Sequence, residues 1–219
     1  MPEKSNRPAL KWLLISSLGI ILLGTTPWVW FSILPDDFHV ARELRTRGFD
    51  IIYNWHDDTI WQHPTHVSGS DKDITPEDCR LICQLPRLFA LHFLRGDMSG
   101  LNLDEIGNCQ ELFWFRFHDV TQFPVSELRK LTASPVRIIS LESRVHVTDF
   151  DLEAFAKFTN LEQLFLETYN AGVTDASLEY FEKIPSLKTL HLPNTSITEK
   201  GVEEFRKKRP DVEIYLYLK

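Results

Sequence analysis

Apolar residues recur along residues 74–205 with a period of about two dozen positions. Each period opens on one apolar residue, and successive openings lie 24, 25, 24, 26 and 24 residues apart. The opening residues are Ile74, Met98, Phe123, Val147, Val173 and Ile197. Further apolar residues follow five, eight and eleven positions later, which is the spacing of one helix face. Each period therefore predicts a short helix with a buried apolar side.

A second block in each period reads L-x-x-L-x-L, and its last three residues alternate as those of a strand do. Two nearly repeated phrases show it best, "LEQLFLETYNAGVT" at 161–174 and "LKTLHLPNTSIT" at 187–198. The unit that opens at Phe123 is one residue short, and Ile139 and Leu141 carry its strand. The chain thus alternates short helices with short strands.

One such unit cannot bury its apolar row alone, whereas stacked units share one core. Each fully buried Leu, Ile or Phe in that core contributes about 1.5–3 kcal/mol. A strand and a short helix every 20–29 residues or so is the signature of leucine-rich repeats. We therefore expect an α/β, right-handed leucine-rich-repeat solenoid with parallel strands on its concave face and short helices on its convex face. Asp149 and Asp175 lie near helix starts, where a carboxylate can cap backbone N–H groups.

Residues 173–205, "VTDASLEYFEKIPSLKTLHLPNTSITEKGVEEF", resemble the "ITDxGLxxLxxLPxLxxLxLxxTxITD" leucine-rich repeats of bacterial, especially planctomycete-like, proteins. About two-thirds of the chain follows this wording more loosely, and "MSGLNLDEI" at 98–106 departs from it. The resemblance implies a scaffold-like binding role.

Both ends of the array have the pattern of caps. Residues 36–73 predict, in order, a helix at His39–Arg47, a stop at Gly48, a strand at Phe49–Tyr53, an irregular stretch at 54–64 and a strand at Thr65–Ser68. The repeats fill 74–219 and end on a closing strand in "DVEIYLYLK". Its inward residues would be Val212, Ile214, Leu216 and Leu218.

The segment 12–34 has no charged residue over its 23 positions. As a helix it would be about 35 Å long, which is enough to cross a bilayer core of about 30 Å. Trp12 stands at one end and Trp28 and Trp30 near the other, as aromatic residues do at membrane interfaces. We expect a transmembrane signal-anchor.

Basic residues precede this segment, while Asp36 and Asp37 follow it. The positive-inside rule then places residues 1–11 in the cytoplasm and the repeat domain outside, periplasmic or extracellular. The alternative is a cleaved signal peptide with Leu13–Leu23 as its apolar region, although no A-x-A-like site follows. Under either hypothesis the rest of the chain is exported.

Composition is that of a globular protein, with 43% hydrophobic and 25% charged residues among 219. The net charge of −7 argues against nucleic acid as a partner, because phosphate binding needs clustered Lys and Arg. The basic run at 205–211 is interpreted as a solvated helix end. Three cysteines make no even set of disulfides, and Cys79, Cys83 and Cys109 fall near apolar positions, so we interpret them as core residues.

The residues between the buried strand positions would project from the concave face. Adjacent strands lie about 4.8 Å apart, so equivalent residues should form ladders. The first predicted ladder is His66, His92, Arg116, Ser140, Phe165 and His191, and the second is His118, Glu142 and Glu167. Trp and Arg dominate interface hot spots, so this surface predicts binding of a protein or peptide. The candidate residues are His92, Trp114, Arg116, His118, Glu142, Phe165, Glu167 and His191.

One irregular stretch, "HDDTIWQHPTH", holds side chains that can bind metals. They are His56, Asp57, Asp58, His63 and His66. Their spacing matches no known metal motif, and the common phosphate-loop, nucleophile and zincin signatures are absent from the sequence. We expect no cofactor, no metal and no catalysis.

The sequence thus favours a membrane-anchored leucine-rich-repeat domain that binds a protein or a cell-envelope component. Two alternatives stay open, a structural envelope spacer that self-associates along the solenoid and a metal-dependent hydrolase that uses the 54–66 loop.

Overall fold

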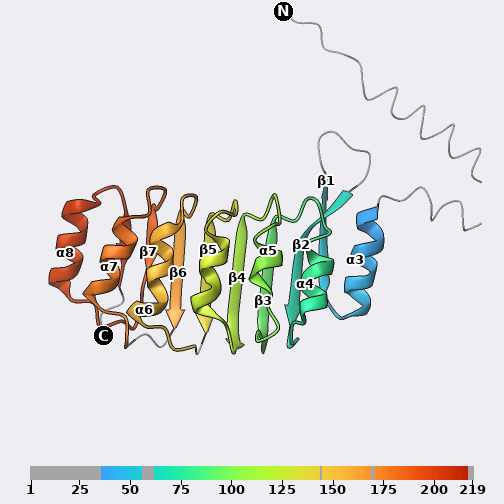
Figure 1. The fold of residues 1–219 in the computed structure, drawn as a ribbon, viewed down its shortest axis with the longest axis horizontal. Coiled ribbons are helices and arrows are strands. Elements are labelled where there is room, and N and C mark those ends of the chain that lie inside the picture. The colour runs from blue at the N-terminus through green and yellow to red at the C-terminus, as the bar shows by residue number, and fades with distance from the viewer. Residues whose placement is uncertain (1–35, 56–61, 144, 169–170, 217–219) are drawn as a thin grey trace, which may run out of the picture.

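A single sheet runs through the whole described part of the protein (Figure 1). The computed structural model describes residues 36–55, 62–143, 145–168 and 171–216. The eight strands lie side by side in chain order: β1 (Asp50–Trp55), β2 (Gln62–Ser70), β3 (Ala90–Asp97), β4 (Trp114–Thr121), β5 (Ile138–Ser143), β6 (Gln163–Thr168), β7 (Thr189–His191) and β8 (Glu213–Tyr215). The pair β1–β2 is antiparallel, and every later neighbour is parallel.

Helices cover one face of this sheet (Figure 1). They are the α-helices α3 (Asp36–Thr46), α4 (Pro76–Ile82), α5 (Leu103–Ile106), α6 (Asp149–Leu152), α7 (Asp175–Glu182) and α8 (Glu199–Lys208), and the 3-10 helices η1 (Val125–Leu131) and η2 (Glu153–Lys157). The sheet face opposite the helices, which the sequence predicts to be concave, is called the open face below. Parallel strands joined by short helices every two dozen residues make this a leucine-rich-repeat solenoid.

The apolar period of the sequence is the core of the solenoid. All six opening residues are buried, with exposed fractions of at most 5%. One continuous row of buried strand residues crosses the sheet in register: Val67, Leu91, Phe115, Ile139, Leu164, Leu190 and Ile214. Each coil therefore covers the apolar row of the next, and the predicted stacking is confirmed.

Aspartates tie successive coils together at the helix side. The carboxylate of Asp149 accepts hydrogen bonds from the Thr174 N–H (2.8 Å), the Thr174 hydroxyl (2.6 Å) and the Ser177 hydroxyl. Asp175 repeats this contact one coil later, accepting from the N–H and the hydroxyl of Thr198, both at 2.7 Å. We call these contacts the Asp–Thr clamps.

The predicted capping by Asp149 and Asp175 acts on the next coil, since the backbone N–H groups that they accept from are those of Thr174 and Thr198. The hydroxyl of Thr174 accepts from the N–H of Ala176 and so caps α7 itself. Each aspartate instead binds the capping threonine of the following coil, because the stacking brings that threonine alongside.

Burial would raise the pKa of Asp149, but the hydrogen bonds from Ser177 and Thr174 outweigh it and hold this pKa below its ordinary value. The carboxylate is therefore charged at neutral pH, and its hydrogen bonds to Thr174 and Ser177 are charge-assisted.

The N-terminal cap differs from the prediction in its bounds. Its helix starts at Asp36 rather than His39, and its first strand reaches Trp55. The second strand is longer than predicted, Gln62–Ser70, so residues 62–64 of the expected irregular stretch pair with β1. Asp37 is buried within α3, with 4% of its surface exposed.

The basic run at 205–211 is only partly solvated. Arg206, Lys207 and Lys208 form the last turn of α8, as predicted. Arg209 instead turns back to the preceding coil and donates to the carbonyl oxygens of Glu182 (3.2 Å), Ile184 (2.8 Å) and Leu187 (3.1 Å). Its side chain is only 13% exposed.

Several predictions lie outside the described residues, including the signal-anchor at 12–34, the cytoplasmic segment 1–11 and Leu218. Among the helices of residues 36–55, 62–143, 145–168 and 171–216, none has the length and apolar character needed to span a bilayer.

We expect Asp149→Asn to lower the free energy of unfolding by about 1–3 kcal/mol at pH 7, because the variant loses charge-assisted acceptors for Thr174 and Ser177. Urea denaturation of the full chain measures this loss. A depressed carboxyl pKa contributes stability above the unfolded pKa of about 4 and loses it as pH falls through the folded pKa. The gap between the two proteins should therefore close below about pH 4.

Asp104→Asn is the matched control, because that carboxylate is 67% exposed in its surface pair with Lys130. It should change stability by less than about 0.5 kcal/mol. Equal losses of unfolding free energy in the two variants would show that the Asp–Thr clamp contributes no more stability than an exposed surface ion pair.

Candidate functional site

The open face carries two ladders of side chains that run across the strands. The first is Ser68, His92, Arg116, Ser140, Phe165, His191 and Tyr215. The second is Ser70, Leu94, His118, Glu142 and Glu167. The predicted neighbours from His92 to His191 and from His118 to Glu167 are therefore confirmed.

His66 was placed in the wrong ladder. It pairs with Ala90 and so belongs to the same row as Trp114, while Ser68 lies opposite His92. The apolar pattern could not fix this register, because Gly69 stands in β2 where later coils have Phe or Leu. Phe49 fills the space, since a Cβ on Gly69 would lie 3.4 Å from its ring.

Glu142 is the electrostatic centre of the open face. Its carboxylate accepts from the Arg116 guanidinium (Nη2, 3.0 Å) and from the Ser140 hydroxyl (3.1 Å). His118 Nε2 lies 3.5 Å from its other oxygen. The Glu142 side chain is 22% exposed, so the cluster is half-buried rather than fully solvated.

Three nitrogen atoms beside this cluster are buried and have no hydrogen-bond partner in the described part of the chain. They are Trp114 Nε1, Arg116 Nε and His118 Nδ1. All three residues come from β4, at alternate positions that face away from the core, while Phe115 and Phe117 between them are buried. Buried donors are nearly always paired, and Trp114 Nε1 and Arg116 Nε can only donate. Trp114 Nε1 and Arg116 Nε could therefore each donate a hydrogen bond to an acceptor from another molecule.

Trp114 and Arg116 stand between two hollows. The smaller has a volume of about 210 Å³, and the larger has a volume of about 440 Å³. The smaller is lined by Ile52, His66, Val67, Ser68, Ala90, Leu91, His92, Trp114 and Arg116. The larger is lined by Trp114, Arg116, Ile138, Ser140, Glu142, Gln163, Phe165 and Glu167. Only Trp114 and Arg116 line both, and the Arg116 guanidinium lies 6.0 Å from the centre of the Trp114 ring.

Trp114 and Phe165, two of the predicted binding residues, are both half-buried. Phe165 packs edge-on against His191, with ring centres 5.9 Å apart, and His191 packs in the same way against Tyr215 at 6.2 Å. His191 Nδ1 also lies 3.1 Å from the Glu167 carboxylate. These side chains are braced by their ladder neighbours.

Burial lowers the pKa of His92, and the positive charges of Arg116 and His118 lower it further, while Glu142 acts in the opposite direction. Burial also lowers the pKa of His66. Both imidazoles are therefore mainly neutral at pH 7, when each ring offers one donor and one acceptor nitrogen.

The sequence analysis missed an aromatic row where the strands begin. Phe89 and Phe113 stack with ring centres 4.9 Å apart, and Arg137 lies over Phe113 at 5.6 Å. Phe89 keeps 40% of its surface exposed. The available signal was that each Phe directly follows the first Leu of an L-x-x-L-x-L block.

The side chains that the sequence offers as possible metal ligands do not gather in the described residues. His63 Nδ1 lies 2.6 Å from the buried carboxylate of Asp37. His66 Nδ1 instead lies 2.8 Å from the Thr65 hydroxyl, and its ring packs against Phe89. The other candidates, at 56–58, lie outside the described residues. Nowhere within the described ranges do three His, Cys, Asp or Glu side chains converge as a metal site requires.

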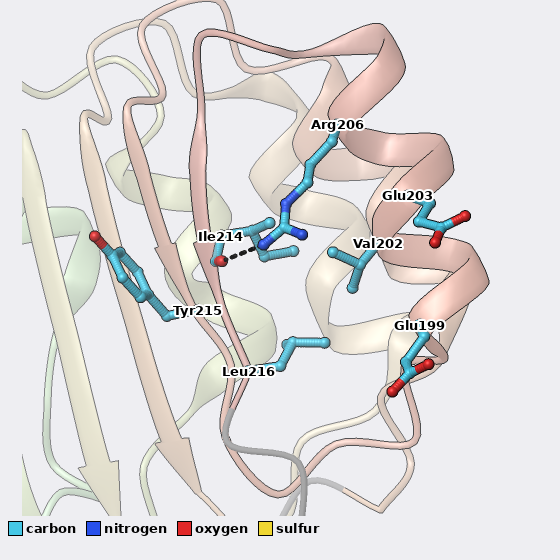
Figure 2. Close-up of a pocket in the computed structure, with 7 residues that line it drawn as sticks. All are labelled: Glu199, Val202, Glu203, Arg206, Ile214, Tyr215 and Leu216. Atoms are coloured by element: carbon cyan, nitrogen blue, oxygen red, sulfur yellow. Dashed lines mark hydrogen bonds between the residues drawn. The ribbon is translucent and has the colours of Figure 1, made fainter.

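A separate groove of about 450 Å³ lies at the last coil, between α8 and β8 (Figure 2). Apolar Val202, Ile214 and Leu216 line it, with Glu199 and Glu203 at its helix side. Figure 2 shows Tyr215 pointing to the other side of β8, where it ends the first ladder. Tyr215 is nevertheless among the residues that line the groove, so the groove adjoins the end of the open face at β8.

Comparison with known proteins found no matching protein family and no matching curated protein. Among solved structures, a leucine-rich-repeat protein of Leptospira interrogans is 20% identical over 62% of this chain and 33% of its own, with a TM-score of 0.46. An internalin of Listeria monocytogenes is 15% identical over 69% of this chain and 40% of its own, with a TM-score of 0.45. The chain thus spans well under two-thirds of either protein. Its class, a leucine-rich-repeat solenoid, follows from its own coil geometry.

We expect Glu142→Gln to lower the pKa of His92 further, because the substitution removes the one negative charge that opposes Arg116 and His118. NMR titration of the His92 ring measures this change. Glu167→Gln is the matched control on the neighbouring strand and should leave the titration unchanged. A rise in the His92 pKa in Glu142→Gln would contradict the described charge arrangement.

Proposed function

We propose that the open face around β4 binds a segment of another protein, without catalysis. The observation that carries this proposal is the pair of unpartnered buried donors, Trp114 Nε1 and Arg116 Nε, with the unpartnered His118 Nδ1 on the same strand. A peptide segment supplies backbone carbonyl oxygens and carboxylates, which are the acceptors that such donors need. A buried donor without a partner costs about 1–3 kcal/mol. An acceptor from a bound segment would form the missing hydrogen bond and remove this cost.

The shape and composition of the face support the same proposal. Trp and Arg are enriched at the energetic centres of interfaces, and here Trp114 and Arg116 form the wall shared by the two hollows. Their neighbours already hold them in place, since Glu142 accepts from Arg116 and the Trp114 ring lies under its guanidinium. A preorganised face loses little side-chain entropy on binding.

Charge is unevenly distributed along the open face. Arg116 lies on β4, whereas Glu142 and Glu167 lie on β5 and β6. A partner segment with a carboxylate over β4 and a basic residue toward β6 would match this gradient. Such complementarity sets the direction and register of binding more than its strength.

The proposal also includes the cellular setting. The uncharged segment 12–34, with basic residues before it and acidic residues after it, would anchor the chain as a single-pass membrane protein and expose the repeats outside the cytoplasm. Protease accessibility in sealed spheroplasts tests this: cleavage of the repeat domain from outside supports export. Full protection until the membrane is broken would contradict it.

The double variant Trp114→Ala, Arg116→Ala should weaken partner binding by about 30-fold or more, as expected when hot-spot residues worth about 2 kcal/mol are lost. The probe is a peptide selected from a random library on the purified full chain, and its dissociation constant is measured for each variant.

The matched control is Phe150→Ala, Arg129→Ala, which removes an aromatic residue and an arginine from the helix side. Phe150 is 78% exposed, and the Arg129 side chain is 55% exposed. Equal affinities of the two double variants would rule out the open face. Cross-linking in native membranes that recovers only the chain itself would favour the self-associating spacer instead.

A further inference from the structure

Two cysteines from consecutive coils meet on the helix side of the solenoid. Cys83 follows α4 as its C-terminal cap, and Cys109 lies just after α5. Their sulfur atoms are 3.1 Å apart and share a thiol hydrogen bond. The sequence analysis placed both in the core, but only Cys109 is buried, whereas Cys83 is half-buried.

We propose that Cys83 and Cys109 are a covalent cross-linking site, forming a disulfide that joins the first two coils. The bonded sulfur distance is about 2.05 Å, so the pair needs to close by only about 1 Å. Both sulfurs sit at helix ends on segments that already pack together, because α4 contacts α5. The disulfide therefore preserves the stacking of the coils.

The repeat register supports a linking role for these two positions. Cys83 lies nine residues after the opening Ile74, and Cys109 lies eleven after the opening Met98. The same positions counted from Val173 and Ile197 are Glu182 and Lys208. These two also bond across coils, with Lys208 Nζ 2.9 and 3.1 Å from the carboxylate oxygens of Glu182. The fold thus brings these positions together twice, once as an ion pair and once as thiols.

The third cysteine is unsuited to the reaction. Cys79 is fully buried, and its sulfur accepts a hydrogen bond from the Asn102 N–H at 3.3 Å. Burial raises the pKa of its thiol to about 11, so it is protonated at neutral pH. The hydrogen bond between the two thiols lowers the pKa of Cys109 despite its burial and raises the pKa of Cys83. One sulfur of the pair therefore ionises in preference to Cys79.

The step is thiol–disulfide exchange with an external disulfide, such as oxidised glutathione. One thiolate of the pair attacks a glutathione sulfur, the glutathione S–S bond breaks, and one glutathione thiol leaves. The second cysteine loses its proton and attacks the mixed disulfide, releasing the second glutathione. Two thiols are thereby oxidised to one disulfide, and one glutathione disulfide is reduced to two thiols. Half-buried Cys83 gives the oxidant access to the pair.

The test incubates the full chain in detergent with a buffer of oxidised and reduced glutathione. The expected results are a fall from three free thiols to one and a peptide map that links Cys83 to Cys109. Adding reductant should lower the thermal midpoint of the oxidised protein by about 6–12 °C, as expected for a disulfide closing a loop of this length.

Two variants separate this site from general thiol chemistry. Cys79→Ala should keep the link, and Cys83→Ser should lose it and show the same thermal midpoint with and without reductant. Three free thiols in folded wild-type protein across the glutathione series would overturn the proposal, as would a link that includes Cys79. The open face lies on the other side of the sheet, so these outcomes are independent of partner binding.

Discussion

Burial of one coil by the next is the constraint on which the rest of the structure depends. A single strand and its short helix leave the apolar row exposed on two sides, and only a neighbouring coil covers it. The row from Val67 to Ile214 is continuous for this reason, with a buried aliphatic or aromatic residue in every strand from β2 to β8. The cap helix α3 closes the first end by packing on α4 and β2.

Polar contacts then fix how the coils sit on one another. The Asp–Thr clamps at Asp149 and Asp175 hold the helix starts in line, and Arg209 satisfies carbonyl oxygens where the helix of the preceding coil ends. Apolar contact alone is non-directional, whereas these hydrogen bonds have one geometry. On the open face, the pairing of β4 with β5 and the ion pair between Arg116 and Glu142 position Trp114, Arg116 and Glu142 as one cluster.

The fold could be predicted from the sequence because the apolar residues that become buried recur at nearly equal intervals along the chain. Residues such as Leu164 and Leu190 recur at the repeat period, which identifies them as buried strand residues. The side chains next to them in each strand are then predicted to lie on the open face, because a strand alternates. The assignment failed at His66, where β2 lacks that pattern and Phe49 fills the gap above Gly69. Register in a strand without its apolar markers depends on packing with a distant residue, which no local pattern contains.

The polar contacts between coils could not be predicted from the sequence either. The adjacency of Thr174 and Asp175 suggests a cap, but it does not reveal that each aspartate binds a threonine about 25 residues further on. Likewise, Cys83 and Cys109 occupy different positions in their own periods, so their 3.1 Å approach appears only in three dimensions. The unpartnered donors on β4 also need coordinates, since a missing partner is a property of the surroundings.

The stacking itself can be measured directly by hydrogen exchange of the full chain, resolved to individual amides under native conditions. If neighbouring coils protect one another, the amides of Phe115, Ile139 and Leu164 exchange slowest and at similar rates, while those of β1 and β8 exchange faster. Central amides that exchange as fast as those at the ends would contradict a shared, mutually buried core.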